Sequence, residues 1–489
     1  MQFMLNQTHI QLDECAPDTT LLEYLRTHLV QRGTKEGCAS GDCGACTVVL
    51  AESGGDGLRY RAINSCITYL GAVGGCQVIT VEGLSHQSGQ LHPVQQAMVD
   101  QHASQCGFCT PGFVMSLFAL THQPQEPHDT TPTERIHQAL GGNLCRCTGY
   151  RPIIDAAKSL LSVPLPDAFN EREDHVHRQL NDWTAINEDG CITLKAGESR
   201  VFASPRSSEA LLNCLAHYPQ ARLVAGGTDL ALESTQQLHS LPQLIYTGRV
   251  AEMRQISERE DALVIGAAVT YSEAEPILTH AFPALAGLLH RLGSLQVRNQ
   301  GTLGGNIANA SPIGDMPPVL LALDAQLRIR DAEGVIDMPI REFFTGYRQT
   351  RLPPGGFIEA LILPRLQPDS FLRIYKLSKR LDDDISAVCL AMHLQLDQDR
   401  IVSARLGLGG MAATPARAYQ TEAALIGQPF TPEGIRAAQM TLATDFTPLT
   451  DVRASAEYRL RSASNLLLRA VLEYQGHSSL EVSYHAHTG

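Results

Sequence analysis

The distribution of cysteine constrains this chain more than any other feature of its sequence. Ten of the 13 cysteines lie before residue 150 in a chain of 489 residues. The first residues, Met1 to Asn6, lack the basic and apolar segments of a secretory signal. We therefore expect a cytoplasmic protein, in which thiols stay reduced and a disulfide framework does not form. The cysteines instead predict metal centres in the N-terminal third.

The first set places three cysteines in one loop and a fourth downstream: Cys38, Cys43, Cys46 and Cys66. This spacing is typical of a plant-type [2Fe–2S] site. Three glycines in the same loop favour tight wrapping, so that thiolates converge and backbone N–H groups reach the sulfurs: Gly37, Gly41 and Gly44. A structural zinc site is the alternative, but zinc prefers cysteines in paired knuckles.

The second set consists of two close pairs: Cys106 with Cys109, and Cys145 with Cys147. Each pair precedes a predicted helix, one from Pro111 and one from Pro152. A helix N-terminus offers free N–H groups and a partial positive charge, which stabilise an anionic thiolate cluster. On spacing alone, both zinc and iron–sulfur remain open for this set.

Periodicity and capping residues divide the chain into predicted parts. Residues 1–84 predict two strands, a helix capped by Thr20 and three further strands. Residues 92–163 predict four short helices, one with the capping box Thr131-x-x-Glu134. The polar, proline-containing stretch that follows is predicted to be a linker. The predicted domains are 1–86, 87–163, 196–370 and 371–489, with the linker at 164–195.

Two glycine-rich turns predict an anion-binding function. Gly226-Gly227-Thr228 follows a buried strand, and Gly304-Gly305-Asn306 comes before Asn309 and Asp315. Such loops cradle a pyrophosphate when backbone N–H groups and Thr or Asn side chains face the anion. Neither turn is a G-x-G-x-x-G, so a Rossmann site is not indicated. A purely structural turn is the alternative for each.

Net charge and hydropathy exclude several classes of function. Lys and Arg number 38 and Asp and Glu number 51, a formal net charge of −13 with no basic run. Such a chain is a poor candidate for binding nucleic acid or an anionic membrane surface. No apolar stretch reaches the roughly 18 residues of a membrane span. No histidine pairing or serine nucleophile motif appears either.

Taken together, these motifs resemble those of the xanthine dehydrogenases, within the molybdenum hydroxylase family. The run beginning Lys35-Glu36-Gly37-Cys38 resembles the family's first iron–sulfur motif. The second iron–sulfur motif resembles Gln105-Cys106-Gly107-Phe108-Cys109 and Gly142-Asn143-Leu144-Cys145-Arg146-Cys147. The family's FAD loops resemble Gly304-Gly305-Asn306 and Ser311-Pro312-Ile313-Gly314-Asp315. It implies a multidomain α+β fold: a ferredoxin-like β-grasp [2Fe–2S] domain and a four-helix [2Fe–2S] domain. An FAD-binding domain of the vanillyl-alcohol-oxidase type and a C-terminal CO-dehydrogenase-flavoprotein-like domain follow.

The resemblance also implies ligands. The eight cysteines of the two sets would hold two [2Fe–2S] clusters, with Cys147 nearest the molybdopterin. The residues implied to contact FAD are Leu223, Val224, Ala225, Gly226, Gly227, Thr228, Asp229, Leu230, Thr302, Leu303, Gly304, Gly305, Asn306, Asn309, Asp315, Ile358 and Lys376. Leu292 stands where animal relatives place a stacking aromatic, and the loop Arg380–Asp384 would lie near the flavin.

The resemblance further implies a function and partners. The chain resembles the small subunit of a bacterial two-subunit enzyme whose molybdopterin-binding large subunit oxidises hypoxanthine and xanthine to urate. This chain would pass the electrons to NAD and would contain no catalytic residue of its own, in a heterotetramer or larger assembly. The alternatives are the equivalent chain of an enzyme acting on aldehydes or N-heterocycles, and a zinc-binding interaction module on an α/β scaffold.

Overall fold

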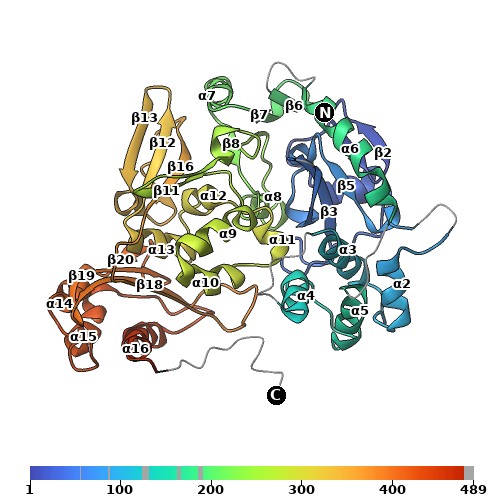
Figure 1. Ribbon diagram of the computed structural model, residues 1–489. Coiled ribbons are helices and arrows are strands. Elements are labelled where there is room, and N and C mark those ends of the chain that lie inside the picture. The colour runs from blue at the N-terminus through green and yellow to red at the C-terminus, as the bar shows by residue number, and fades with distance from the viewer. Residues whose placement is uncertain (56, 86–88, 124–130, 162–166, 186–190, 478–489) are drawn as a thin grey trace. The chain divides into compact units, whose positions relative to one another are not determined.

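The chain divides into two compact units, which are described separately (Figure 1). The computed structural model describes residues 1–55, 57–85, 89–123, 131–161, 167–185 and 191–477. The first unit contains Met1–Ala251 and the short segment Gly293–Gly301, and the second contains Glu252–Leu292 and Thr302–Gly489. Residues 196–370, predicted as one domain, therefore contribute to both units.

A five-stranded mixed sheet forms the start of the first unit. Its order is β2-β1-β5-β3-β4, with β1 and β5 parallel and the other neighbours antiparallel. The strands are β1 (Gln2–Leu5), β2 (Thr8–Gln11), β3 (Thr47–Gly54), β4 (Gly57–Asn64) and β5 (Gln77–Ile79). Thr20 caps α1 (Leu21–Glu23), as predicted, by accepting the backbone N–H of Glu23 at 3.1 Å. The helix continues as a π-helical turn over Tyr24–His28.

Four short helices follow, as the proline positions predict, and they lie together in Figure 1. They are α2 (Pro93–Asp100), α3 (Thr110–Thr121), α4 (Pro132–Leu140) and α5 (Arg151–Leu161). The capping box at Thr131 and Glu134 is present. Helix α3 is buried along almost its whole length, so it forms the core of this bundle.

The stretch 164–195, predicted to be a linker from its polar composition, contains regular secondary structure. An 18-residue helix, α6 (Ala168–Ala185), occupies most of it, although residues 162–166 and 186–190 lie outside the described part. The polar composition hides an apolar stripe at helical spacing, Val176, Leu180 and Trp183, which packs on Met4.

The buried carboxylate of Asp167 begins α6. Its Oδ1 accepts the N–H groups of Phe169 and Asn170, both at 2.9 Å. Its Oδ2 lies 2.8 Å from His92 Nε2 and 3.1 Å from His122 Nε2. Asp167 therefore ties the start of α6 to the helical bundle.

A second sheet, with the order β6-β7-β9-β8, completes the first unit. Its strands are β6 (Cys191–Ala196), β7 (Arg200–Pro205), β8 (Arg222–Val224) and β9 (Gln243–Tyr246), and its helices are α7 (Ser208–His217), α8 (Ala231–Thr235) and α11 (Leu295–Arg298). Strands β7, β9 and β8 run parallel, and β6 pairs antiparallel with β7.

The second unit begins with an antiparallel sheet of order β10-β11-β16-β12-β13. Its strands are β10 (Ile256–Glu258), β11 (Ala262–Gly266), β12 (Gln326–Asp331), β13 (Gly334–Pro339) and β16 (Phe357–Pro364), beside the small hairpin β14 (Phe344–Gly346) and β15 (Gln349–Thr350). Its helices are α9 (Tyr271–Ala281), α10 (Ala286–His290), α12 (Leu303–Ala308) and α13 (Met316–Leu323).

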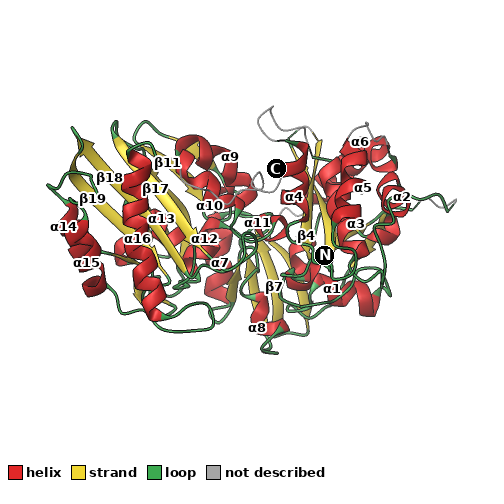
Figure 2. Cartoon of the chain, turned by 90° about the horizontal axis from the view of Figure 1, so that it is seen from below, coloured by secondary structure: helices red, strands yellow, loops and turns green. Residues whose placement is uncertain are grey.

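A four-stranded antiparallel sheet with helices on both faces ends the chain (Figure 2). It contains β17 (Ser370–Leu377), β18 (Val388–Asp397), β19 (Arg400–Gly409) and β20 (Ala416–Arg417), followed by α14 (Tyr419–Leu425), α15 (Arg436–Asp445) and α16 (Ala456–Tyr474). Gly407 lies so close to Pro318 of α13 that a side chain would not fit, whereas Leu406 and Leu408 join the core under α14–α16. No helix among the described residues is long and apolar enough to cross a bilayer.

Candidate iron–sulfur and flavin sites

The fold gathers the four cysteines of the first set, although Cys66 lies 20 residues beyond Cys46. Cys66 sits in a short 3-10 turn after β4, and its Sγ lies 3.3 Å from Cys46 Sγ, with both side chains buried. Cys38 reaches hydrogen-bond contact with the thiols of both Cys43 and Cys66. The four cysteines of the first set therefore lie close together in the fold, through the contacts of Cys38 with Cys43 and Cys66 and of Cys66 with Cys46.

The crowding of these sulfurs favours one thiolate at the expense of its neighbours. Hydrogen bonds from Cys43 and Cys66 hold the pKa of Cys38 well below its ordinary value, against the effect of burial. The hydrogen bond with Cys38, together with burial, raises the pKa of Cys43. Hydrogen bonds with Cys38 and Cys46, together with burial, raise the pKa of Cys66. Holding all four as thiolates requires a compensating cation, which is what a bound iron cluster supplies.

The backbone of the loop fits such a cluster. Ser40 N–H points at Cys38 Sγ from 3.4 Å. A side chain at Gly37 would place its Cβ 2.8 Å from Cys43 Sγ, so glycine leaves room for the sulfur. Gly41 and Gly44 have φ values of +86° and +67°, in the left-handed region that favours glycine. These features allow backbone donors to face sulfur, as the glycine pattern predicts.

The second set also converges, and it lies at the protein surface. Cys106 contacts Cys147, and Cys109 contacts Cys145. Cys106 and Cys147 are exposed, whereas Cys109 and Cys145 are half-buried. As predicted, the pairs come directly before helices, because Cys109 caps α3 and α5 begins at Arg151.

Thr148 supplies donors to this second set. Its N–H lies 3.4 Å and its hydroxyl 3.1 Å from Cys145 Sγ. Burial alone would raise the pKa of Cys145, but the hydrogen bonds from Thr148, together with those from Cys147 and Cys109, lower it. Burial and the hydrogen bond with Cys145 raise the pKa of Cys109 to about 12. Tyr150 accepts the backbone N–H of Cys145 at 2.9 Å and so fixes the end of the loop.

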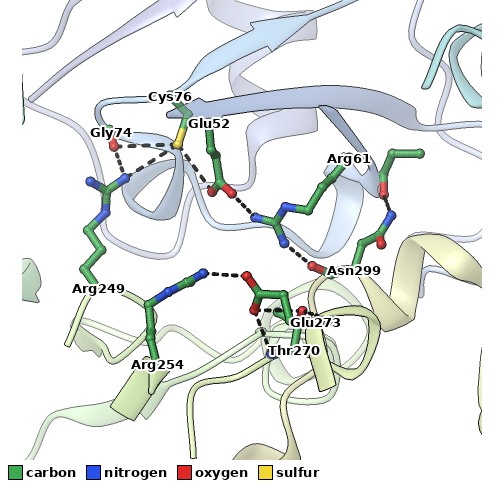
Figure 3. Close-up of polar contacts among 10 residues, drawn as sticks. Glu52, Arg61, Gly74, Cys76, Arg249, Arg254, Thr270, Glu273 and Asn299 are labelled. Carbon is green, nitrogen blue, oxygen red and sulfur yellow. Dashed lines mark hydrogen bonds and ion pairs between the residues drawn. The ribbon is translucent and has the colours of Figure 1, made fainter. Parts of the chain in front are cut away.

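The remaining cysteines with described side chains belong to neither set and form no disulfide bond. Cys76 and Cys389 are buried, Cys15 and Cys214 are half-buried, and the side chain of Cys191 lies outside the described part. Cys76 is drawn in Figure 3 beside Glu52, whose carboxylate also pairs with Arg61 at 2.5 Å. Burial and the nearby Glu52 raise the pKa of Cys76 to about 12.

In the first unit, the predicted flavin residues form the turn between β8 and α8. Val224 is buried and Gly227 has a φ of +75°. A Cβ on Gly226 would collide with the carbonyl of Gln300, so this glycine is needed for packing within the unit. The backbone N–H of Ala231 closes the turn on Gly227 O at 2.9 Å.

In the second unit, the predicted flavin residues Thr302 to Asn306 form the cap and the first turn of α12. Thr302 caps this helix by accepting Gly305 N–H at 3.0 Å, and Gly304 packs without a side chain against Ala267. Asn306 Oδ1 is buried and has no hydrogen-bond partner among the described residues. A polar ligand group such as a flavin hydroxyl or ring N–H would satisfy it, so Asn306 fits the predicted role.

Three further predicted residues of the second unit are all buried. Asp315 Oδ2 pairs with Lys376 Nζ at 2.6 Å, and Asp315 Oδ1 accepts the hydroxyl of Ser386 at 2.5 Å. Ile358 lies within β16, opposite Ile329 of β12. The sequence does not reveal the ion pair, because 61 residues separate its partners.

Arg291 holds the backbone of the charged loop after β17. It donates to Leu381 O at 3.0 Å, Lys376 O at 2.9 Å and Ser378 Oγ at 2.9 Å. Leu292, which follows it, is buried. The loop Arg380–Asp384, which the resemblance implies to lie near the flavin, therefore has one end attached to the core of its unit.

Four family models match the chain in the order of its domains. They are a 2Fe-2S iron-sulfur cluster binding domain over residues 3–71, a [2Fe-2S] binding domain over 80–158, an FAD binding domain in molybdopterin dehydrogenase over 197–366 and a CO dehydrogenase flavoprotein C-terminal domain over 373–474. Together they account for most of the chain and for both cysteine sets.

Individual relatives agree with these models. The xanthine dehydrogenase of Emericella nidulans is 35% identical over 501 residues, which cover 91% of this chain and 36% of that protein. The chain thus spans about a third of the length of the curated relatives it matches.

Solved structures show the same fold over part of the chain. A carbon monoxide dehydrogenase chain from Hydrogenophaga pseudoflava is similar at 27% identity and a TM-score of 0.54, over 57% of this chain and 98% of that one. A quinoline 2-oxidoreductase chain from Pseudomonas putida 86 is similar at 27% identity and a TM-score of 0.52, over 56% and 96%. The chain belongs to the molybdenum hydroxylase family, as an electron-transfer chain that combines two [2Fe–2S] domains with an FAD-binding domain.

Proposed function

We propose that this chain is the electron-transfer subunit of a xanthine dehydrogenase. It would receive electrons from a molybdenum cofactor on a partner subunit and deliver them to NAD. The observation that carries the proposal is the convergence of two separate four-cysteine sets in a chain that also contains an FAD-binding domain. The resemblance to xanthine dehydrogenases supports the choice of substrate.

The proposed cluster ligands are the eight predicted cysteines: Cys38, Cys43, Cys46 and Cys66 for one cluster, and Cys106, Cys109, Cys145 and Cys147 for the other. Bound clusters carry single electrons, and a flavin collects them and releases a pair as a hydride to NAD. The chain's own residues hold the sulfurs in place and direct hydrogen bonds at them. Ser40 N–H does so in the first set and Thr148 in the second.

The proposed FAD contacts are the predicted turns, from Leu223 to Leu230 and from Thr302 to Asn306, with Asn309, Asp315, Ile358 and Lys376. Asn306 supports this assignment because its buried side-chain oxygen lacks a partner among the described residues. Asp315 and Lys376 would act through their ion pair, which fixes the position of β17 relative to α13.

The exposed face around the second cysteine set supports docking of the partner there. Cys106 and Cys147 are exposed, and the apolar side chains Phe108 and Leu144 beside them are 47% and 48% exposed. We propose that this face receives the molybdopterin-binding subunit, in a heterotetramer or larger assembly. Because eight thiolates must stay reduced to bind iron, the proposal includes a cytoplasmic location.

A second candidate is the equivalent subunit of an enzyme that oxidises an N-heterocycle or an aldehyde. The similarity to a quinoline 2-oxidoreductase chain favours the N-heterocycle among these. The zinc-binding module considered from the sequence is not supported, because the models that match both cysteine sets are [2Fe–2S] domains.

The experiment co-purifies the chain with its partner subunit and assays xanthine with NAD. Cys43→Ser should abolish NAD reduction and remove one of two paramagnetic signals from the dithionite-reduced complex. Cys76→Ser is the matched control, because Cys76 is a buried cysteine directly before β5 and belongs to neither set. We expect this control to retain both signals and the activity.

Full activity with a normal cluster spectrum in Cys43→Ser would refute the electron path. Two normal signals in a complex that reduces NAD with quinoline or an aldehyde, but not with xanthine, would refute xanthine as the substrate. That result would support the second candidate. A colourless complex that contains zinc would refute both.

A further inference from the structure

Three segments that are far apart in the sequence meet between the two cysteine sets, all within the first unit. They are the loop around Gly44, the loop of Gly142 and Asn143, and residues 294–296 of the segment Gly293–Gly301. A Cβ on Gly44 would collide with the carbonyl oxygen of Gly142, and a Cβ on Gly142 would collide with Gln296 and Ser294. We call this contact the junction.

Asn143 is at the centre of the junction, and its side-chain amide is fully hydrogen-bonded. Its Nδ2 donates to Gly44 O at 3.1 Å and to Thr47 Oγ1 at 3.3 Å. Its Oδ1 accepts the hydroxyl of Ser116 at 2.7 Å and Nε2 of Gln296 at 3.0 Å. An amide has two donors and two acceptor sites, so no bonding capacity of Asn143 is left over.

Gln296 closes the junction from the third segment. It is completely buried on α11, and its Nε2 lies within reach of Asn143 Oδ1 and, at 3.2 Å, of Ser116 Oγ. Gly44 O also accepts both the N–H and the hydroxyl of Thr47, at 3.1 and 2.7 Å. The carbonyl oxygen of Gly44, the residue after Cys43, therefore accepts three hydrogen bonds, and Asn143 donates one of them.

One hydrogen bond joins the two cysteine loops next to Asn143. The N–H of Leu144, which precedes Cys145, donates to the carbonyl of Cys43 at 3.0 Å. Cys43 belongs to the first set and Cys145 to the second. The main chains that carry one cysteine of each set are thus joined by a direct hydrogen bond, which lies beside the bond from Asn143 Nδ2 to Gly44 O.

We propose that Asn143 and Gln296 are positioning residues for electron transfer between the two sets. They would hold the Cys43 and Cys145 loops at a fixed separation and keep the Leu144-to-Cys43 hydrogen bond formed. In each transfer one electron leaves the cluster of the second set, which is oxidised, and reduces the cluster of the first. No proton moves and no covalent bond changes. This inference rests on the proposed function, because it requires a cluster at both sets.

The test uses the full chain with its clusters, reduced with dithionite and examined by electron paramagnetic resonance at low temperature. Two clusters held close together split each other's signals. The informative variants are Asn143→Asp, which keeps the shape but cannot donate to Gly44 O, and Gln296→Ala. The matched control is Asn299→Ala, because Asn299 is a buried asparagine of the same segment that donates to Ala62 O at 2.9 Å, away from the junction (Figure 3).

We expect Asn143→Asp and Gln296→Ala to keep both signals at their wild-type g values and midpoint potentials but to lose the wild-type splitting. Exchange of the Leu144 amide with deuterium should accelerate in the same two variants. Asn299→Ala should change neither readout. If Asn143→Asp does not fold, Ser116→Ala replaces it, since it removes one hydrogen bond to Asn143 Oδ1 and one from Gln296 Nε2 while both amide side chains stay in place.

Wild-type splitting and Leu144 exchange in both informative variants would overturn the inference and leave the proposed function intact. The same would follow if Asn299→Ala lost the splitting to an equal extent, because the effect would then reflect general loosening. Failure of the iron-replete wild-type chain to show two signals would instead refute the proposed function itself.

Discussion

Gly44→Ala is the perturbation whose effect the structure predicts most directly. Gly44 has a φ of +67°, and an alanine in this left-handed region costs about 1–2 kcal/mol. The added Cβ would also collide with the backbone of Gly142 and Asn143. Because backbone cannot rotate away as a side chain can, this overpacking adds about 1–3 kcal/mol. We therefore expect Gly44→Ala to lower the free energy of unfolding by about 2–5 kcal/mol.

Other glycines of the first unit separate the two contributions. Gly197 has a φ of +69° and no atom within 4 Å of the position that an alanine methyl group would take, so Gly197→Ala should cost only the conformational part, about 1–2 kcal/mol. Gly112 has no positive φ, but its Cβ would collide with the carbonyl of Gly44, so Gly112→Ala should cost only the packing part, about 1–3 kcal/mol. Gly54 has neither feature, and Gly54→Ala should stay within about 0.5 kcal/mol of the wild type.

The assay is urea unfolding of the four variants, followed by circular dichroism and by the visible absorption of the clusters. Iron content, measured in parallel, shows whether Gly44→Ala still binds the first cluster. If Gly44→Ala costs no more than Gly197→Ala, the contact with Gly142 relaxes freely, and the reasoning about a tightly packed junction is refuted.

Two further predictions concern buried charges. Burial alone would raise the pKa of Asp167, but the imidazoles of His122 and His92, which lie against its carboxylate, hold the pKa well below its ordinary value. A depressed folded-state pKa stabilises the protein above the unfolded value of about 4, and this stabilisation is lost as the pH falls below it, so Asp167→Asn should flatten the acid dependence of unfolding relative to the wild type. An unchanged acid profile would contradict this. Lys376→Met should cost about 3–5 kcal/mol, because it leaves the buried Asp315 carboxylate without its cation, and it should reduce the flavin bound per chain. The double variant with Asp315→Asn should recover part of the stability. No recovery would show that the charge of Asp315 is not the cause.

The sequence predicts correctly those features that depend on neighbouring residues. The loop of Cys38 to Cys46, the caps at Thr20 and Thr131 and the helix starts after Cys109 and before Pro152 are all present. Each is set by covalent geometry, by local hydrogen bonds or by the spacing of a few residues. The sequence also contains the apolar stripe of α6 at helical spacing, but the surrounding charged residues and prolines obscure it.

Only the tertiary structure decided which distant groups meet and what they do there. Gln296 carries no motif, and its importance depends on complete burial against Asn143, 153 residues away. The Asp315–Lys376 pair is equally invisible in the sequence. A hydrogen bond or an ion pair has a large energetic effect only where packing removes water, and packing is a property of the whole fold. The cysteine spacings therefore indicated a plant-type cluster for the first set and left the metal of the second set open, while the folded chain determined how the two cysteine loops are held together.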